Sequence, residues 1–203
     1  KISVFSDLNN LEDISALKDY SAVCGITKAE LQHYFSNELG LLADSCKMTT
    51  EEADNALKAN YGGYFFNWEG KEVYNPFSVL NALKNRQFKD YWFETGTPTL
   101  LVRMLQNTNA DLASLTRDEV ATAVIDCIFD DDNPLPVIYQ TGYLTISEYD
   151  SEFGTYRLAY PNREVKEGFL RFLLPYYTQQ CRTSVFGVSN YIKDLREGNV
   201  DGF

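Results

Sequence analysis

The chain has 203 residues and carries 18 Lys and Arg against 29 Asp and Glu, which gives a formal net charge of -11. Hydrophobic residues make up 44% of it and aromatic residues 14%, so the composition is that of a packed globular protein and not of a disordered one. Tight binding to a nucleic-acid backbone relies on Lys and Arg. The acidic balance therefore argues against a surface that binds DNA or RNA throughout.

Metal, membrane and export signals are missing from the sequence. Cys24, Cys46, Cys127 and Cys181 are widely spaced, and the single His33 cannot complete a Cys/His zinc pattern with them. We expect buried, reduced thiols, no bound metal and a cytoplasmic location. No apolar run approaches the roughly 20 residues that cross a bilayer, and no signal peptide is recognised, so we expect no membrane partner.

The chain begins with a predicted strand and a long helix. ISVF, residues 2–5, alternates like the end of a buried strand. Thr27 and Glu30 form a capping box, and the apolar residues after them recur at helical spacing. This pattern predicts one helix from about Lys28 to Asp44.

A second helix and a hairpin are predicted next. TEEADNALKANYG indicates a helix that is capped near Thr50 and ended by Gly62 and Gly63. YFFNWEGKEVY alternates aromatic and polar residues around Glu69-Gly70, which is typical of a short hairpin.

Two helix starts place Pro directly after a capping residue. Asn75 and Pro76 begin NPFSVLNAL, and Thr97 and Pro98 begin the helix of TGTPTLLVRML. A phosphate-binding loop is the alternative for the second start, but this segment has no Lys, and Pro98 lacks a backbone N–H. We therefore predict a capped helix with a buried stripe of Leu100, Leu101, Met104 and Leu105.

The next segment predicts a helix followed by a break. TRDEVATAVIDCIF has a capping box of Thr116 and Glu119 and helical periodicity, and DDDNP ends it. The three adjacent carboxylates of DDDNP favour a solvated turn over a metal site, because like charges resist burial together.

The last organised passage has the element order of a winged-helix-like unit. Val137–Thr141 is a predicted short helix ended by Gly142, and YLTISEY and TYRLAY are predicted strands around the turn DSEFG. Asn162 caps a long amphipathic helix. Residues 135–174 carry four basic and five acidic residues, so a packing role is favoured, and DNA binding through the wing is the alternative.

No catalytic centre is predicted. His33 lies beside Tyr34 on a helix, and no nucleophile motif such as G-x-S-x-G accompanies it. The aromatic clusters NYGGYFFNW and DYWF favour a core or an internal interface, with stacking on bases as the alternative. A self-contained enzyme with His33 in a deep pocket is a further alternative.

Six segments follow one another along the chain: SVFSDLNNLEDIS, YGGYFFN, VYNPFSVLNAL, YWFETGTPTLLVRML, IYQTGYLTI and YPNREVKEGF. Together they resemble the C-terminal half of AAA-ATPase-like proteins, a family common in Bacteroidetes and other anaerobes. Members typically carry a PD-(D/E)XK-type nuclease domain downstream. One departure is the family's Gly-Tyr-His-Phe motif, which is Gly63-Tyr64-Phe65-Phe66 here.

The resemblance implies a mainly α (α+β) fold, with a helical AAA-type lid followed by a winged-helix-like unit with small β-hairpins. It implies four regions: the end of the ATPase core at 1–15, the lid at 16–112, the winged-helix-like domain at 113–180 and a linker helix at 181–203. The expected partners are an N-terminal P-loop core and a C-terminal nuclease-like domain, which would lie outside this chain.

The resemblance also implies where nucleotide would lie. ATP and Mg would be held by the P-loop core of the parent protein, and DNA would be bound only through that parent. This chain contains neither a Walker motif nor the nuclease E-x-K strand, so we expect it to be non-catalytic and to bind no cofactor itself. The residues implied to lie near nucleotide are Ser6, Asn9, Asn10, Gly96, Thr97 and Pro98.

Overall fold

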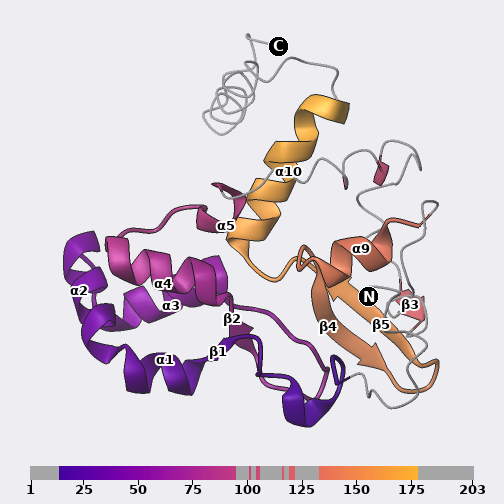
Figure 1. The fold of residues 1–203 in the computed structure, drawn as a ribbon, viewed down its shortest axis with the longest axis horizontal. Coiled ribbons are helices and arrows are strands. Elements are labelled where there is room, and N and C mark those ends of the chain that lie inside the picture. The colour runs from indigo at the N-terminus through magenta and orange to yellow at the C-terminus, as the bar shows by residue number, and fades with distance from the viewer. Residues whose placement is uncertain are drawn as a thin grey trace, which may run out of the picture.

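The computed structural model describes residues 14–94, 101, 104–105, 116, 119–121 and 133–177. Within them the fold is α+β, as expected, with several helices and two small antiparallel sheets (Figure 1). No helix in this part of the chain combines the length and the apolar character needed to cross a bilayer. The predicted strand at 2–5 and the predicted TGTP helix start lie outside the described residues.

The first set of elements, residues 26–94, is called the helical unit below and lies on the left of Figure 1. Its two short strands pair antiparallel, with Ile26 opposite Tyr74. A 3-10 turn, η2 (Lys18–Tyr20), precedes the unit. Its elements are β1 (Ile26–Thr27), α1 (Lys28–Tyr34), α2 (Ser36–Cys46), α3 (Thr50–Tyr61), β2 (Val73–Tyr74), α4 (Pro76–Asn85) and α5 (Tyr91–Glu94).

The predicted helix caps of this unit are confirmed. Thr27 Oγ1 accepts from the backbone N–H of Glu30, and the Glu30 carboxylate accepts from the Thr27 backbone at 2.8 Å. A second capping box, Thr49 with Glu52, begins α3 one residue before the predicted cap. Asn75 accepts from two N–H groups of the first turn of α4. These contacts stabilise helix starts through residues three positions apart, which is why the sequence alone showed them.

The single helix predicted from Lys28 to Asp44 is wrong, because Phe35 divides it into α1 and α2. Phe35 has φ -123° and ψ 20°, which is not helical. Its N–H nevertheless donates to Leu31 O at 3.0 Å, and its carbonyl accepts from Leu39 N at 2.8 Å. The four-residue hydrogen-bond spacing therefore continues across the bend. For this reason the apolar residues keep their helical spacing, and the sequence pattern gives no sign of the bend.

The predicted hairpin around Glu69-Gly70 is reduced to one bridge. Tyr64 and Val73 exchange backbone hydrogen bonds of 3.2 and 3.0 Å. The remaining pairing of β2 goes to β1, which lies about 47 residues earlier in the chain. A distant strand therefore replaced the local partner that the alternation suggested.

The second set of elements is called the hairpin unit and lies on the right of Figure 1. Its last helix, α10, lies in the upper middle of the picture, on the side of the helical unit. Its sheet has the order β3-β5-β4 and is antiparallel throughout. The predicted order of helix, strand, turn, strand and helix is confirmed, and Gly142 follows the first helix at φ +85°. The elements are β3 (Glu119–Ala121), α9 (Leu135–Gln140), β4 (Thr145–Asp150), β5 (Thr155–Ala159) and α10 (Arg163–Tyr177).

The sequence predicted that Thr116 and Glu119 form a capping box at the start of a helix. This prediction is wrong for Glu119, because Glu119 is the first residue of strand β3. Val120 is buried while Glu119 and Ala121 are exposed, which is the alternation of a strand with one covered face. The Glu119 carboxylate accepts from Thr155 Oγ1 at 2.9 Å and pairs with Arg157 at 3.3 Å, both on β5. Cross-strand contacts therefore overrode the local capping pattern.

Each unit has its own buried apolar cluster. In the helical unit the cluster joins α1, α2, α3 and α4, with Leu31, Leu42, Leu57 and Val79 fully buried. The cluster of the hairpin unit joins its sheet to α9 and α10. Leu101, Met104 and Leu105 are buried as predicted, and Leu101 and Leu105 belong to the second cluster. Tyr64 and Val73 also pack there, so the helical unit contributes residues to both clusters.

Candidate functional site

The first turn of α10 is where the hairpin unit meets the helical unit. Asn162, 8% exposed, accepts from the backbone N–H of Val165 at 3.0 Å and thereby caps α10. Its side-chain amide donates to the carbonyl of Gly62 at 2.8 Å, just after α3 ends. One buried side chain therefore begins a helix in one unit and holds the end of a helix in the other.

The backbones of the two units also approach closely at this point. Gly63 has φ +80°, a conformation that residues with a Cβ adopt only with strain. A Cβ on Gly63 would lie 1.9 Å from the carbonyl oxygen of Pro161. Glycine is therefore required for both the conformation and the contact.

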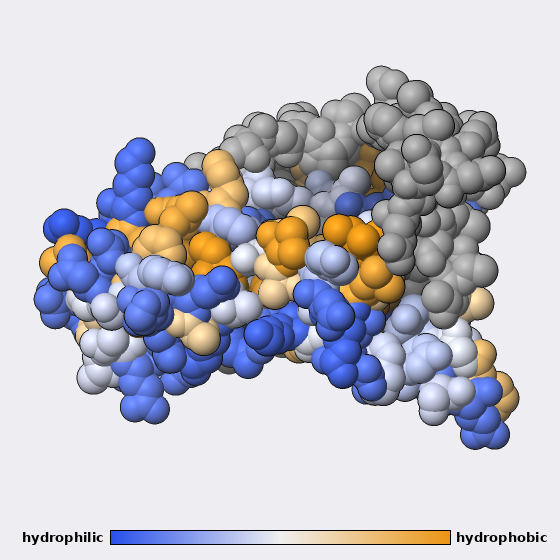
Figure 2. Space-filling model, turned by 60° about the horizontal axis from the view of Figure 1, so that its bottom comes forward, coloured by the Kyte–Doolittle hydropathy of each residue, from blue (hydrophilic) through white to orange (hydrophobic). Residues whose placement is uncertain are grey.

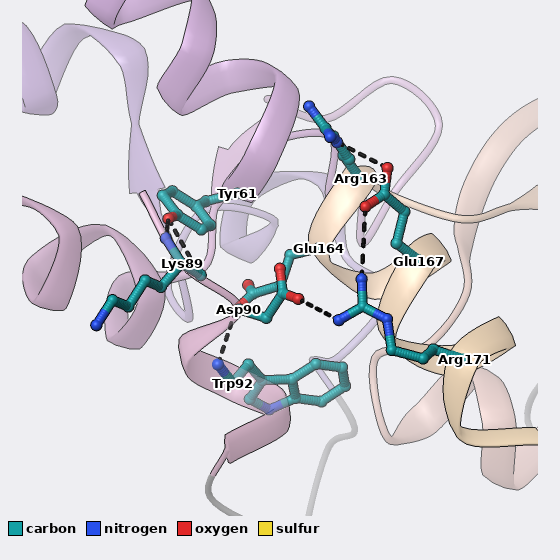
Figure 3. Close-up of polar contacts among 8 residues, drawn as sticks. All are labelled: Tyr61, Lys89, Asp90, Trp92, Arg163, Glu164, Glu167 and Arg171. Atoms are coloured by element: carbon teal, nitrogen blue, oxygen red, sulfur yellow. Dashed lines mark hydrogen bonds and ion pairs between the residues drawn. The ribbon is translucent and has the colours of Figure 1, made fainter. Parts of the chain in front are cut away.

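A buried carboxylate joins α10 to two further helices, and Figure 3 shows its contact with Trp92 of α5. Glu164 is 2% exposed and lies in the first turn of α10. Its Oε2 accepts from the Ser78 hydroxyl of α4 at 2.7 Å, and its Oε1 accepts from the backbone N–H of Trp92 in α5 at 2.7 Å. A negative charge at the start of a helix is also favoured by the helix dipole.

Exposed ion pairs surround the buried contacts. Arg171 pairs with Asp90 at 3.1 Å, which links α10 to the loop before α5, and Arg163 pairs with Glu167 at 2.7 Å within α10 (Figure 3). Exposed pairs of this kind contribute about 0–1 kcal/mol each. The buried hydrogen bonds of Asn162 and Glu164 therefore contribute more to joining the units than these exposed pairs do.

The segment that supplies Trp92 is itself held in place. The Tyr61 hydroxyl donates to the Lys89 carbonyl at 2.9 Å and accepts from the Lys89 N–H at 3.0 Å. Burial raises the pKa of Tyr61 above its ordinary value, and burial does the same for the nearby Tyr64. A tyrosine hydroxyl is already protonated at neutral pH, and the raised pKa keeps both of these protonated further into the alkaline range, so they act as fixed hydrogen-bonding groups.

Together these contacts form a joint, which we call the α10 interface: Gly62, Gly63, Ser78, Trp92, Asn162 and Glu164. Its polar groups are buried and their hydrogen bonds are directed at one another, so the site is built to hold two units in one orientation. Among the described residues, no group of three or more His, Cys, Asp or Glu could hold a metal ion.

All six residues implied to lie near nucleotide are outside the described residues: Ser6, Asn9, Asn10, Gly96, Thr97 and Pro98. His33 is exposed on α1, with its ring 4.6 Å from that of Tyr34. Cys24 is also exposed and Cys46 is partly exposed, so the expectation of buried thiols is wrong for Cys24.

Sequence reasoning missed Ser78, Trp92 and Glu164. A signal was present for Glu164, which adjoins Val165 on the buried side of an amphipathic helix. A charged residue on an apolar helix face, next to an N-cap, indicates a carboxylate that is buried with partners. Nothing in the sequence identifies those partners, which lie 86 and 72 positions away along the chain.

The chain is similar to a longer protein from Azotobacter chroococcum mcd 1, described as an uncharacterized protein in the vnfD 5′ region. The two are 38% identical over 204 residues, which cover 98% of this chain and 37% of the relative. The chain thus spans little more than a third of the length of that curated relative. No protein-family profile and no solved structure matches the chain.

Replacing Glu164 tests the α10 interface directly. We expect Glu164→Ala to lower the free energy of unfolding by about 2–4 kcal/mol, because the Ser78 hydroxyl and the Trp92 N–H lose their buried acceptor. Glu164→Gln should cost about 1 kcal/mol or less, since its amide can accept from Trp92 and donate to Ser78. Urea denaturation of the 203-residue chain measures both, and equal losses in the two variants would contradict this role.

Replacing Gly63 tests the backbone contact. Gly63→Ala should lower the free energy of unfolding by more than about 2 kcal/mol, because both the positive φ and the contact with Pro161 O must change. Gly40→Ala is the matched control, since a Cβ there meets nothing within 4 Å inside helix α2. It should raise stability by about 0.5–1 kcal/mol. A Gly63→Ala chain as stable as the Gly40→Ala chain would be inconsistent with the close approach.

Proposed function

We propose that these 203 residues are the non-catalytic lid and winged-helix-like region of a cytoplasmic AAA-like ATPase. Their role would be to couple closure over nucleotide to a downstream nuclease-like domain. In this proposal ATP and Mg are bound by a P-loop core outside the chain, with Ser6, Asn9, Asn10, Gly96, Thr97 and Pro98 near the nucleotide. The helical unit belongs to the lid, and the hairpin unit is the winged-helix-like part.

The α10 interface is the observation that carries this proposal. A lid transmits its movement only if the next unit moves with it as one body. Asn162 fixes α10 to the end of α3, and Glu164 fixes it to α4 and α5. A rotation of the helical unit would therefore carry α10, and the sheet packed on it, in the same direction.

Two further observations support the proposal. Six segments in order resemble the C-terminal half of AAA-ATPase-like proteins, and these segments extend from near the first residues to α10. The Azotobacter relative is much longer than the stretch that this chain matches. A region that works as part of a larger polypeptide is consistent with both.

The charge of the hairpin weighs against the alternative of direct DNA binding. Arg157 is the one basic residue between positions 145 and 159. It pairs with Glu148 at 2.6 Å and with Glu119 at 3.3 Å. Asp150 and Glu152 add negative charge near the turn. A phosphate backbone approaching this hairpin would meet carboxylates, so the hairpin favours a protein contact.

The proposal predicts that nucleotide acts on the hairpin unit through the α10 interface. In the longer polypeptide that the proposal requires, adding Mg-ATP should slow hydrogen–deuterium exchange in α4 and also in β5. Glu164→Ala should keep the change in α4 and lose the change in β5, whereas Glu164→Gln should keep both.

The 203-residue chain alone should bind Mg-ATP with a Kd weaker than about 100 μM, because the phosphate-binding loop is expected in the P-loop core outside this chain.

Two results would contradict the proposal. One is micromolar binding of Mg-ATP by the isolated chain in isothermal titration. The other is a shift of a DNA fragment by the isolated chain at low salt that disappears as the salt concentration rises, which would favour the DNA-binding alternative.

A further inference from the structure

An apolar cavity of about 540 Å³ lies between the two units, and the six residues of the α10 interface are not among those that line it. Three segments line it. They are residues 14–24, which we call the N-terminal arm, the aromatic segment 64–66, and residues 139–145, where α9 ends and β4 begins. Figure 2 brings the bottom of Figure 1 forward and shows hydrophobic side chains across the middle of that face, above a mostly hydrophilic lower edge.

The described lining of the cavity is rich in aromatic residues. None of the described residues that line it is Asp, Glu, Lys or Arg, although 23% of the whole chain is charged. Five aromatic residues line it, and they are Tyr20, Tyr64, Phe65, Phe66 and Tyr139. A charged ligand would lose its hydration there without gaining an opposite charge, whereas a flat apolar ring would be favoured.

Hydrogen bonds hold the walls of the cavity together. Thr145 Oγ1 accepts from the Phe65 N–H at 2.7 Å and donates to the Phe65 carbonyl at 3.2 Å, which joins β4 to the aromatic segment. The side-chain amide of Asn67, the residue directly after the aromatic segment, donates to the Ala16 carbonyl at 2.8 Å and so holds the N-terminal arm beside that segment. Fixed walls of this kind lower the ordering cost of binding a ligand.

The mouth of the cavity is apolar as well. Val23 is 69% exposed and Tyr20 is 48% exposed, and both belong to the N-terminal arm. When a ligand covers exposed apolar surface beside a cavity, the free energy of binding becomes more favourable by roughly 25 cal/mol per Å² of that surface.

We propose that this cavity binds a small, uncharged aromatic molecule of about two rings. Its volume lies within the range of about 300–1,000 Å³ that is usual for small-molecule sites. Nucleoside triphosphates are disfavoured, because the described lining residues supply no cation for their phosphates. The ligand would touch the segments 64–66 and 139–145 together, so it would stabilise the docking of the two units. Binding goes beyond the coupling role and does not depend on it.

The test uses three probes that share one ring system and differ in charge: neutral 3-methylindole, anionic indole-3-acetate and cationic tryptamine. In NMR titrations of the 203-residue chain, 3-methylindole should bind with a Kd of about 1 mM or tighter. Its shifts should centre on the amides of 64–66 and 139–145. The charged probes should bind at least about 10-fold more weakly.

A variant that fills the cavity supplies the control. Ala16 lines the cavity and is exposed, so Ala16→Trp should weaken 3-methylindole binding by at least about 10-fold without disturbing either buried cluster. Ala29→Trp places the same ring on the exposed face of α1 and should leave the Kd within about 2-fold. If Ala16→Trp fails to fold, the charge series on the unchanged chain still decides the question.

Several outcomes would overturn the assignment. They are no binding of 3-methylindole at its solubility limit, shifts centred away from the lining segments, or equal affinity for the three probes. A capped tripeptide with a central tryptophan that binds at least about 10-fold more tightly than 3-methylindole would identify a slot for a protein side chain instead. None of these results depends on nucleotide, so they are separate from the test of the coupling role.

Discussion

The buried carboxylate of Glu164 is the constraint on which the arrangement of this molecule depends. A carboxylate out of contact with water must be hydrogen-bonded, and two of its donors come from α4 and α5 of the other unit. Hydrogen bonds are directional, so the carboxylate fixes orientation in a way that apolar packing alone does not. Asn162, two residues earlier in the chain, adds a second directional contact. The two units thereby acquire one preferred arrangement.

Local features of the fold were predictable from sequence, and non-local ones were not. The capping box at Thr27 and the Asn75-Pro76 helix start involve neighbours within three residues, so their patterns could be recognised. Strand β3 depends on β5, about 36 residues later, and its capping-box pattern favoured a helix instead. The bend at Phe35 keeps the helical hydrogen-bond spacing and so leaves no trace in the periodicity.

The same division holds for the candidate sites. Glu164 could have been noticed as a charged residue on a buried helix face, but Ser78 and Gly62 are 86 and 100 positions from their partners. The apolar cavity assembles three segments that are separated along the chain in the same way. Both sites join the helical unit to the hairpin unit. A ligand in the cavity and the hydrogen bonds of α10 would therefore stabilise one and the same docked state.

We infer that the α10 interface makes the two units a single cooperative body. Native-state hydrogen exchange across a denaturant series measures this most directly, because it gives an opening free energy for each element. We expect the slowest amides of α4 and β5 to open in one event with a common free energy. Opening of β5 at a free energy lower by about 2 kcal/mol or more, while α4 stays protected, would show two independent units and rule out a single cooperative body.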